Sequence, residues 1–178
     1  MWDSLKETVS GLAPFRDLSS RLASGGEVAR AGGLAGSSRS LVLSALVPVI
    51  GRGVVAVASD PVKARDVAAD LEHFGAGRVV FYPEDEILPY DYHDPDRNLT
   101  GMQMSALAAV AEKRCDVLVC THRSLLKKVF APEVLLGLLA DLRKGEANDP
   151  YELAETLVRL GYERHNICLL YTSPSPRD

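Results

Sequence analysis

Three short apolar segments, separated by stretches with helical periodicity, constrain the fold of this chain more than any other feature. They are Gly53–Ser59 (GVVAVAS), Arg78–Pro83 (RVVFYP) and Cys115–Thr121 (CDVLVCT). Nearly continuous apolar runs of this length are typical of strands that are buried on both faces of a parallel sheet. Parallel strands need long crossover connections, which the intervening helical segments can supply. We therefore predict an α/β fold with a doubly wound parallel sheet.

The segments between and around these runs predict helices. Asp60 followed by Pro61 marks a helix start, because aspartate caps a helix well and proline fits its first turn. Gly75 and Gly77 mark the end of the same helix. One helix is expected to begin at Ser4. Further helices are expected over Phe15–Leu22, Ser38–Val49, Pro61–Phe74, Met102–Lys113, His122–Val129, Pro132–Leu142 and Pro150–Leu160.

Length and composition limit the class of protein. The 178 residues, 47% of them hydrophobic, suffice for one domain and the beginning of a second. A net charge of -4 lacks the basic excess of a stand-alone nucleic-acid-binding domain. Three cysteines form no disulfide framework, so we expect free thiols in a reducing cytosol. No signal peptide is evident, and the longest apolar run, Leu41–Ile50, is too short to span a membrane. We expect a soluble, cytoplasmic protein with no membrane partner.

The segment Gly33–Ser40 (GLAGSSRS) is the best candidate for a phosphate-binding loop. Such loops read G-x-x-x-x-G-K-[ST], with glycines that let the backbone approach the phosphates and a lysine that contacts them. Counted from Gly33, the pattern places Ser38 at the second glycine and Arg39 at the lysine. Counted from Gly36, it fails at both positions. A helix N-terminus could still hold an anion here. We interpret five residues as the remnant of a loop that has lost its cofactor: Gly33, Gly36, Ser38, Arg39 and Ser40.

The acidic and histidine residues form no recognisable catalytic or metal-binding pattern. The stretch Glu84–Asp96 is interrupted by prolines and lacks the spacing of a calcium-binding loop. His122 follows a predicted strand end, where doubly wound folds keep their sites, but no serine or cysteine has an evident base and acid beside it. We predict no catalytic residue and no metal site in this chain.

The last eleven residues, 168–178 (CLLYTSPSPRD), differ in character from the rest. Their back-translation resembles the transposase adapter that is used to prepare sequencing libraries. We therefore interpret residues 168–178 as a non-native tail and exclude them from fold reasoning. This interpretation implies that the chain is a piece of a longer parent protein.

Five segments match, in order, segments of one known family. The most informative is residues 81–91 (FYPEDEILPYD), which resembles a strand that runs into an L-P-Y-D loop; Asp85 stands where the family often has tryptophan. The other four are residues 34–41 (LAGSSRSL), 54–74, 115–126 and 153–164 (LAETLVRLGYER). Together they resemble the N-terminal, UvrB-like module of the bacterial transcription-repair coupling factor (Mfd) family. The incomplete phosphate loop favours Mfd over UvrB, in which this loop is complete.

The resemblance implies a helicase-like or RecA-like fold and a role in DNA repair. The parent would be an ATP-dependent DNA translocase that displaces stalled RNA polymerase and recruits UvrA for nucleotide excision repair. Its motor, with ATP and magnesium as cofactors, would lie downstream of this fragment, which itself would be non-catalytic and hold no cofactor. RNA polymerase and DNA would bind downstream domains. UvrA would bind a second domain, whose contact residues follow the matched segments, so no binding residue is carried over.

These observations predict four parts of the chain. Residues 1–30 form a helical lead-in, 31–142 a UvrB-like domain without a functional phosphate loop, 143–167 the start of the UvrA-recruiting domain, and 168–178 the tail. Two alternatives remain open. The chain could be a fragment of a UvrB-like or superfamily 2 helicase that binds ATP through Arg39, or a free-standing nucleotide-sugar or response-type α/β domain. ATP binding by the fragment would distinguish the first alternative.

Overall fold

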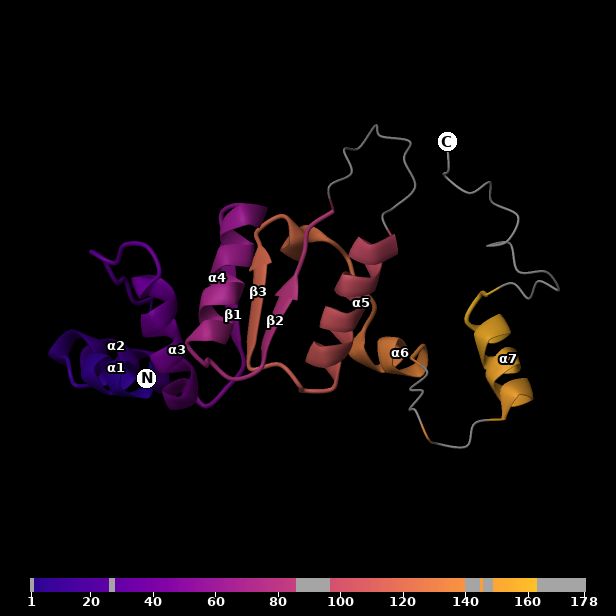
Figure 1. Cartoon of the computed structure of the whole chain (residues 1–178), viewed down its shortest axis with the longest axis horizontal. Helices are drawn as coiled ribbons and strands as arrows, with labels where there is room; N and C mark the ends of the chain where they lie inside the picture. The colour runs from indigo at the N-terminus through magenta and orange to yellow at the C-terminus, as the bar shows by residue number, and fades with distance from the viewer. Residues whose placement is uncertain (1, 26–27, 86–96, 140–144, 146–148, 163–178) are drawn as a thin grey trace, which may run out of the picture. The chain divides into compact units, whose positions relative to one another are not determined.

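Three parallel strands form a single sheet at the centre of the first part of the chain (Figure 1). They are β1 (Val54–Ala58), β2 (Val79–Tyr82) and β3 (Val117–Thr121), in the order β1-β3-β2. β3 lies between the other two, so that Val117 faces Val54 on one side and Val79 on the other. The structure is a computed structural model that describes residues 2–25, 28–85, 97–139, 145 and 149–162. The predicted α/β class and the parallel sheet are confirmed.

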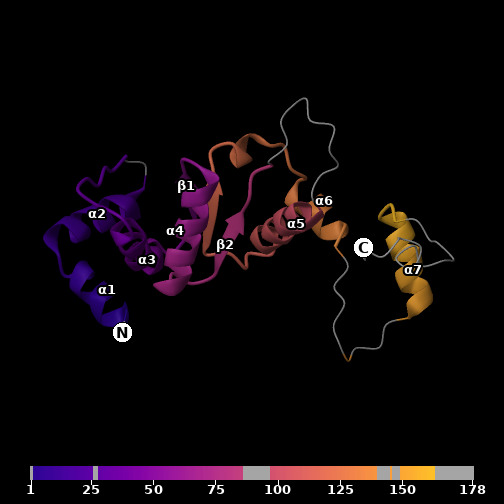
Figure 2. The ribbon, with the colours of Figure 1, turned by 45° about the horizontal axis from the view of Figure 1, so that its top comes forward.

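Helices cover both faces of this sheet. Helix α4 (Pro61–His73) connects β1 to β2, and α5 (Arg97–Ala111) connects β2 back to β3. Across the sheet, the chain passes from β1 beyond the position of β3 to β2, and then returns from β2 to β3. Because crossovers between parallel strands are right-handed, these two connections in opposite directions place their helices on opposite faces. Helix α4 contacts all three strands and α5 contacts β2. Figures 1 and 2 show α4 and α5 on opposite sides of the strands, as a doubly wound fold requires.

The larger core lies between α4 and the sheet. Leu71, Val117 and Val119 are completely buried there. Each such side chain stabilises the fold by about 1.5–3 kcal/mol relative to an exposed position. Asp60 begins α4 as expected, since its side chain accepts a hydrogen bond of 2.9 Å from the Lys63 backbone N–H. The small residues Ala64 and Ala68 let this helix approach the strands closely.

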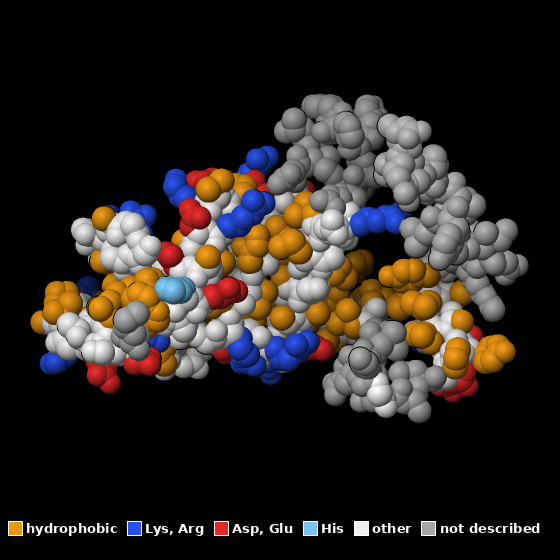
Figure 3. All heavy atoms as spheres, viewed as in Figure 1, with side chains coloured by type: hydrophobic (Ala, Val, Ile, Leu, Met, Phe, Trp, Pro, Cys, Tyr) orange, Lys and Arg blue, Asp and Glu red, His pale blue; other side chains and the backbone are white. Residues whose placement is uncertain are grey.

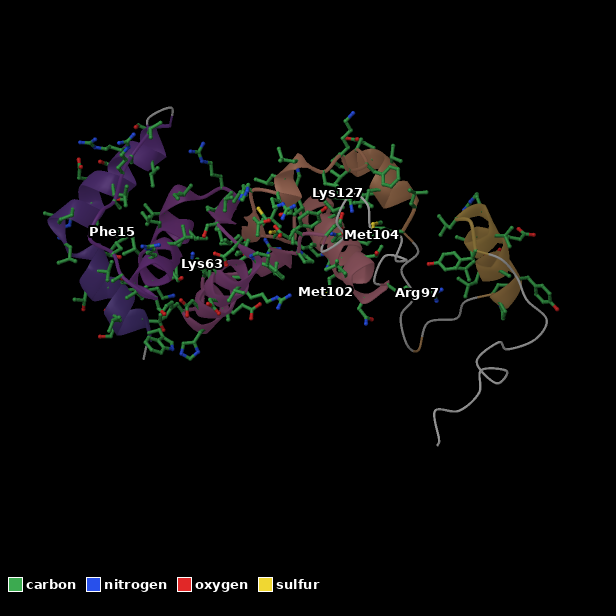
Figure 4. The ribbon with its side chains drawn as sticks, turned by 90° about the horizontal axis from the view of Figure 1, so that it is seen from above. Phe15, Lys63, Arg97, Met102, Met104 and Lys127 are labelled. Carbon is green, nitrogen blue, oxygen red and sulfur yellow. The ribbon has the colours of Figure 1, made fainter. Side chains whose placement is uncertain are left out.

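Three helices form a second cluster at the N-terminal end. They are α1 (Trp2–Ser10), α2 (Ala13–Ser24) and α3 (Ser38–Ile50), and α3 also packs against α4. Phe15 of α2 is buried against Ala45 and Leu46 of α3 and lies inside this group of helices (Figure 4). Trp2 packs edge-on against Phe74, with ring centroids 5.1 Å apart. Helices α1 and α2 thus pack against α3, and Trp2 of α1 also contacts the residue that follows α4.

One expectation about the sheet is wrong. The continuous apolar segment Gly53–Ser59 predicted a strand buried on both faces, but β1 is an edge strand with alternating burial. Val55 and Val57 are 54% and 53% exposed. Both face away from α4, and α5 covers the opposite face only beside β2 and β3. Periodicity alone could not reveal this, because it does not show how far a helix reaches across a sheet.

The segment after β3 also differs from its prediction. The helix expected over His122–Val129 is only a short 3₁₀ turn, Ser124–Leu126, and Lys127 is already extended. The reason is local, since Ser124 bonds back to the backbone of Thr121 and favours a turn over a helix. Helix α6 (Pro132–Gly137) is shorter than expected, and α5 begins five residues before the predicted Met102.

The chain divides into two compact units, Met1–Leu136 and Gly137–Asp178. In the second unit the structure describes one helix, α7 (Pro150–Arg159). Asp149 caps it by accepting a 2.8 Å hydrogen bond from the Tyr151 backbone N–H. None of the residues of α7 is buried. The four predicted domain boundaries stay predictions, and residues 163–178, with the proposed tail, lie outside the described residues.

Candidate functional site

The carboxyl edge of the sheet is the place where an α/β fold of this kind carries its polar groups. Ligands in open α/β sheets bind outside the carboxyl ends of the strands, where the following loops separate to opposite faces. Here the loop after β2 supplies Glu84 and Asp85, and the loop after β3 supplies Arg123, Ser124 and Lys127. Residues from these two loops meet one another and the middle of α5.

Gln103 on α5 is the centre of one hydrogen-bond network at this edge. Its side chain is 5% exposed. Gln103 Nε2 donates to the Pro83 carbonyl at 3.1 Å and to Asp85 Oδ1 at 2.8 Å. Lys127 Nζ donates to Asp85 Oδ2 at 2.8 Å and to Gln103 Oε1 at 3.3 Å. The nitrogen and the oxygen of the buried amide thus both have hydrogen-bond partners, as burial of a polar group requires. Figure 4 shows the position of Lys127.

A second network joins Thr121 at the end of β3 to the loop after β2. The Thr121 backbone N–H donates to Ser124 Oγ at 3.0 Å, and Ser124 Oγ donates to the Thr121 carbonyl at 2.9 Å. Thr121 Oγ1 donates to the Glu84 carboxylate. The Glu84 carboxylate also lies 4.0 Å from Arg123 Nη1. Thr121 and Ser124 are buried, so this network holds the two loops in a fixed relation.

The contacts and burial at this edge shift the pKa values of three of its side chains. The hydrogen bond from Lys127, aided by that from Gln103, holds the pKa of Asp85 below its ordinary value, although burial opposes the shift. Burial raises the pKa of the Tyr82 hydroxyl and of the Cys120 thiol, so both stay protonated at neutral pH. His122 is exposed. In the described part of this edge, the polar groups bond to one another and thereby link the two loops.

The remnant of the phosphate loop lies before and within the first turn of α3. Gly33 and Gly36 have positive φ angles of 78° and 54°. Ser38 Oγ donates to the Ala35 carbonyl at 2.6 Å, and Arg39 Nε donates to the Leu34 carbonyl at 3.1 Å. The residues between 28 and 37 form no strand.

Two positions of this remnant matter for nucleotide chemistry. A phosphate loop needs a cation that reaches the β/γ-phosphates and a hydroxyl that reaches magnesium. Arg39, at the first position, bonds to the backbone of its own loop. Ser40, at the second, is only 2% exposed. In this conformation the Ser40 hydroxyl is not presented for its role, whereas Arg39 is exposed and bonds to the loop through Nε alone among the contacts of the described residues.

Other candidate positions add no site. Among the described residues, no group of three or more His, Cys, Asp or Glu side chains could hold a metal ion. The residues of the acidic stretch Glu84–Asp96 that could be considered as metal ligands, Asp91, His93, Asp94 and Asp96, lie outside the described residues. None of the helices within the described ranges is long and apolar enough to cross a membrane.

Sequence reasoning missed the residues that organise the carboxyl edge, chiefly Gln103 and Lys127. One signal was available for Gln103, since it lies among apolar and small residues in the helix that follows Met102. A polar residue on an apolar helix face that is buried must find hydrogen-bond partners. Lys127 carried no such signal, because its position was predicted to be helical.

Comparison with known proteins shows what the chain resembles. No model of a protein family matches it. It is 35% identical over 161 residues to the transcription-repair-coupling factor of Myxococcus xanthus, a match that covers 86% of this chain and 13% of that protein. It is 24% identical over 153 residues to the UvrABC system protein B of Caldicellulosiruptor bescii and to that of Caldicellulosiruptor saccharolyticus. Each of these two matches covers 76% of this chain and 22% of the relative. The chain thus spans less than a quarter of the length of these relatives.

Proposed function

We propose that this chain, a UvrB-like module of the transcription-repair-coupling factor family, is a non-catalytic part of a longer DNA-repair protein. In this proposal the whole protein acts in nucleotide excision repair, where it displaces stalled RNA polymerase and recruits UvrA. The observation that carries the proposal is the similarity to the coupling factor, which extends over 86% of the chain at 35% identity. Similarity to UvrABC system protein B at lower identity supports the UvrB-like character.

The conformation of the phosphate-loop remnant supports the non-catalytic part of the proposal. Arg39 replaces the lysine of the motif, and its side chain bonds to the Leu34 carbonyl. Ser40, at the position of the magnesium ligand, is buried. Binding of magnesium at the position of Ser40 would therefore require a buried hydroxyl to become exposed. ATP and magnesium would act in the motor domains of the parent protein.

The second unit supports the proposed role in recruitment. Helix α7 is amphipathic: Leu153 and Leu157, with Leu160 just after its end, are less exposed than Glu155 and Arg159. An isolated helix of this length is marginally stable in water, so its apolar stripe needs further residues to pack against. We propose that this helix opens the domain that binds UvrA, and that the UvrA contact residues follow it in the parent.

A pull-down with UvrA tests the proposal. One sample is this chain of 178 residues, and the other is the parent protein shortened to end after its complete second domain. We expect the longer version to retain UvrA and the shorter chain not to retain it. Equal retention by both would place the contact surface in the first unit, and no retention by either would contradict the proposed recruitment.

A further inference from the structure

A cleft of about 910 Å³ lies at the amino edge of the sheet, opposite the edge that carries the polar networks. It lies entirely within the first unit. The start of β1 and the start of β3 form part of its wall, together with the turn of residues 75–78. The last turns of α3 and α5 and Lys6 of α1 complete it. None of the contacts described at the carboxyl edge involves these residues.

Part of the lining of the cleft is apolar. Val47, Val54, Val55, Val110 and Leu118 line it. Val55 is 54% exposed and Val110 is 43% exposed, because α5 does not extend over the β1 side of the sheet. An apolar group that covers half-exposed valines in a concave surface lowers the free energy, because it removes apolar surface from water.

The lining of the cleft also carries positive charge. Four cationic side chains line it, and Asp116 is the one acidic residue among its described lining residues. Figure 3 shows Lys and Arg side chains gathered at the lower border of the first unit, below the strands of Figure 1. This concentration contrasts with the net charge of -4 of the whole chain. The cationic residues are Lys6, Arg52, Arg78 and Lys113.

Part of this positive charge already has a structural role. Helices α3, α4 and α5 end at this edge, and helix C-termini carry a partial negative charge that attracts cations. Lys6 Nζ donates to the Gly75 carbonyl at 3.1 Å, just beyond the end of α4. Arg78 pairs with Asp116. Arg52 Nη2 donates to the Leu22 carbonyl at 3.4 Å. Arg52 and Lys113 form no ion pair with any residue in the described ranges, and both are exposed.

We propose that this cleft is a docking site for an acidic segment of a partner protein that also carries apolar side chains. Its carboxylates would pair with Arg52 and Lys113, and an apolar side chain would cover Val55. Single-stranded nucleic acid fits the cleft less well, because such sites use aromatic side chains for base stacking and the described lining residues include none. This inference is independent of the proposed function, since the lining of the cleft includes no residue of Gly33–Ser40 and none of α7.

Fluorescence anisotropy with a labelled dodecapeptide of alternating glutamate and leucine tests the proposal. The double variant Arg52→Glu/Lys113→Glu should weaken binding about five- to tenfold, as expected for two exposed ion pairs. The matched control Arg30→Glu/Lys128→Glu makes the same charge change at exposed positions outside the cleft and should bind within about twofold of the unchanged chain. Val55→Thr keeps the shape of the side chain but adds a hydroxyl, and should weaken binding by about two- to fivefold.

Several results would overturn the proposal. They are the absence of peptide binding, equal weakening by the control double variant, and undiminished binding by Val55→Thr. Stronger binding of a twelve-nucleotide oligothymidylate than of the peptide would also overturn it, in favour of a nucleic-acid site. Thermal melting of each variant beside the unchanged chain shows that a loss of binding does not arise from unfolding.

Discussion

Arg78 donates two side-chain hydrogen bonds to Asp116, one from Nε to Oδ2 at 3.0 Å and one from Nη2 to Oδ1 at 2.8 Å. The Arg78 backbone N–H donates a third, to Oδ2 at 2.7 Å. This contact ties the start of β2 to the start of β3, 38 residues later in the chain. Its bidentate geometry is the strongest form of arginine–carboxylate pair.

The first prediction concerns this pair and pH. The hydrogen bonds from Arg78 lower the pKa of Asp116 from 3.8 to about 2. A carboxyl whose pKa is lower in the folded state stabilises the fold above its unfolded pKa, and this stabilisation disappears as the pH falls through the folded value. Asp116→Asn should therefore be less stable than the unchanged chain near neutral pH, and the difference should shrink between about pH 4 and pH 2. Urea unfolding at several pH values measures this difference.

The control Asp66→Asn makes the same charge change at an exposed position of α4. An identical dependence of its stability on pH would contradict the assignment of the effect to Asp116.

A second prediction concerns the main core. Leu71 is completely buried between α4 and the sheet. Leu71→Ala should lower the free energy of unfolding by about 2–5 kcal/mol, because it removes buried apolar surface and leaves a cavity. Leu126 is 82% exposed. The same substitution at Leu126 should change the free energy by no more than about 0.5 kcal/mol. Chemical denaturation of both variants checks the difference, and equal effects would mean that the α4 face is not the core.

A third prediction concerns the turn before β2. Gly77 has a φ of 90°, and a Cβ there would lie 2.8 Å from Asp116 Oδ2. Gly36 has a φ of 54° and open space where a Cβ would lie. Gly36→Ala should cost only the backbone strain of about 1–2 kcal/mol. Gly77→Ala should cost more, because the added methyl also displaces the carboxylate that Arg78 binds. Melting temperatures rank the two, and the opposite order would disprove the close approach.

A fourth prediction concerns the network at the carboxyl edge. Gln103→Leu leaves Asp85 and the Pro83 carbonyl without their shared donor, and should lower the free energy of unfolding by about 1–3 kcal/mol. Ser105→Ala, on an exposed position of the same helix, is the control and should be nearly neutral. Thermal or chemical denaturation measures both. A neutral Gln103→Leu would show that the network does not hold the loops.

A fifth prediction concerns nucleotide binding. Calorimetric titration of the chain with ATP and magnesium should show no saturable binding at micromolar concentrations, because the loop lacks the lysine and the second glycine of the motif. Arg39→Ala serves as the comparison. Saturable binding that this substitution abolishes would support the alternative of an ATP-binding helicase fragment and refute the non-catalytic role.

Sequence alone determined the α/β class, the three strands and the capped helix α4. Each of these depends on local information: an apolar run of strand length, or a capping aspartate followed by proline and then by a terminating glycine. That Gly33–Ser40 does not match the complete phosphate-loop motif was equally readable, because the motif is a local pattern of residue types. The resemblance to the coupling factor family rested on such local segments in order, and the 35% identity confirms it.

Tertiary structure decided how these elements meet. Gln103 and Lys127 are 24 residues apart, and only the return of β3 between β1 and β2 brings them within hydrogen-bond distance. The exposure of Val55 and Val57 likewise depends on the edge position of β1 and on the reach of α5 across the sheet. Burial and pairing are properties of neighbours that are distant in sequence. A local sequence pattern indicates which side chains need partners, but only the packed fold determines which residues they contact.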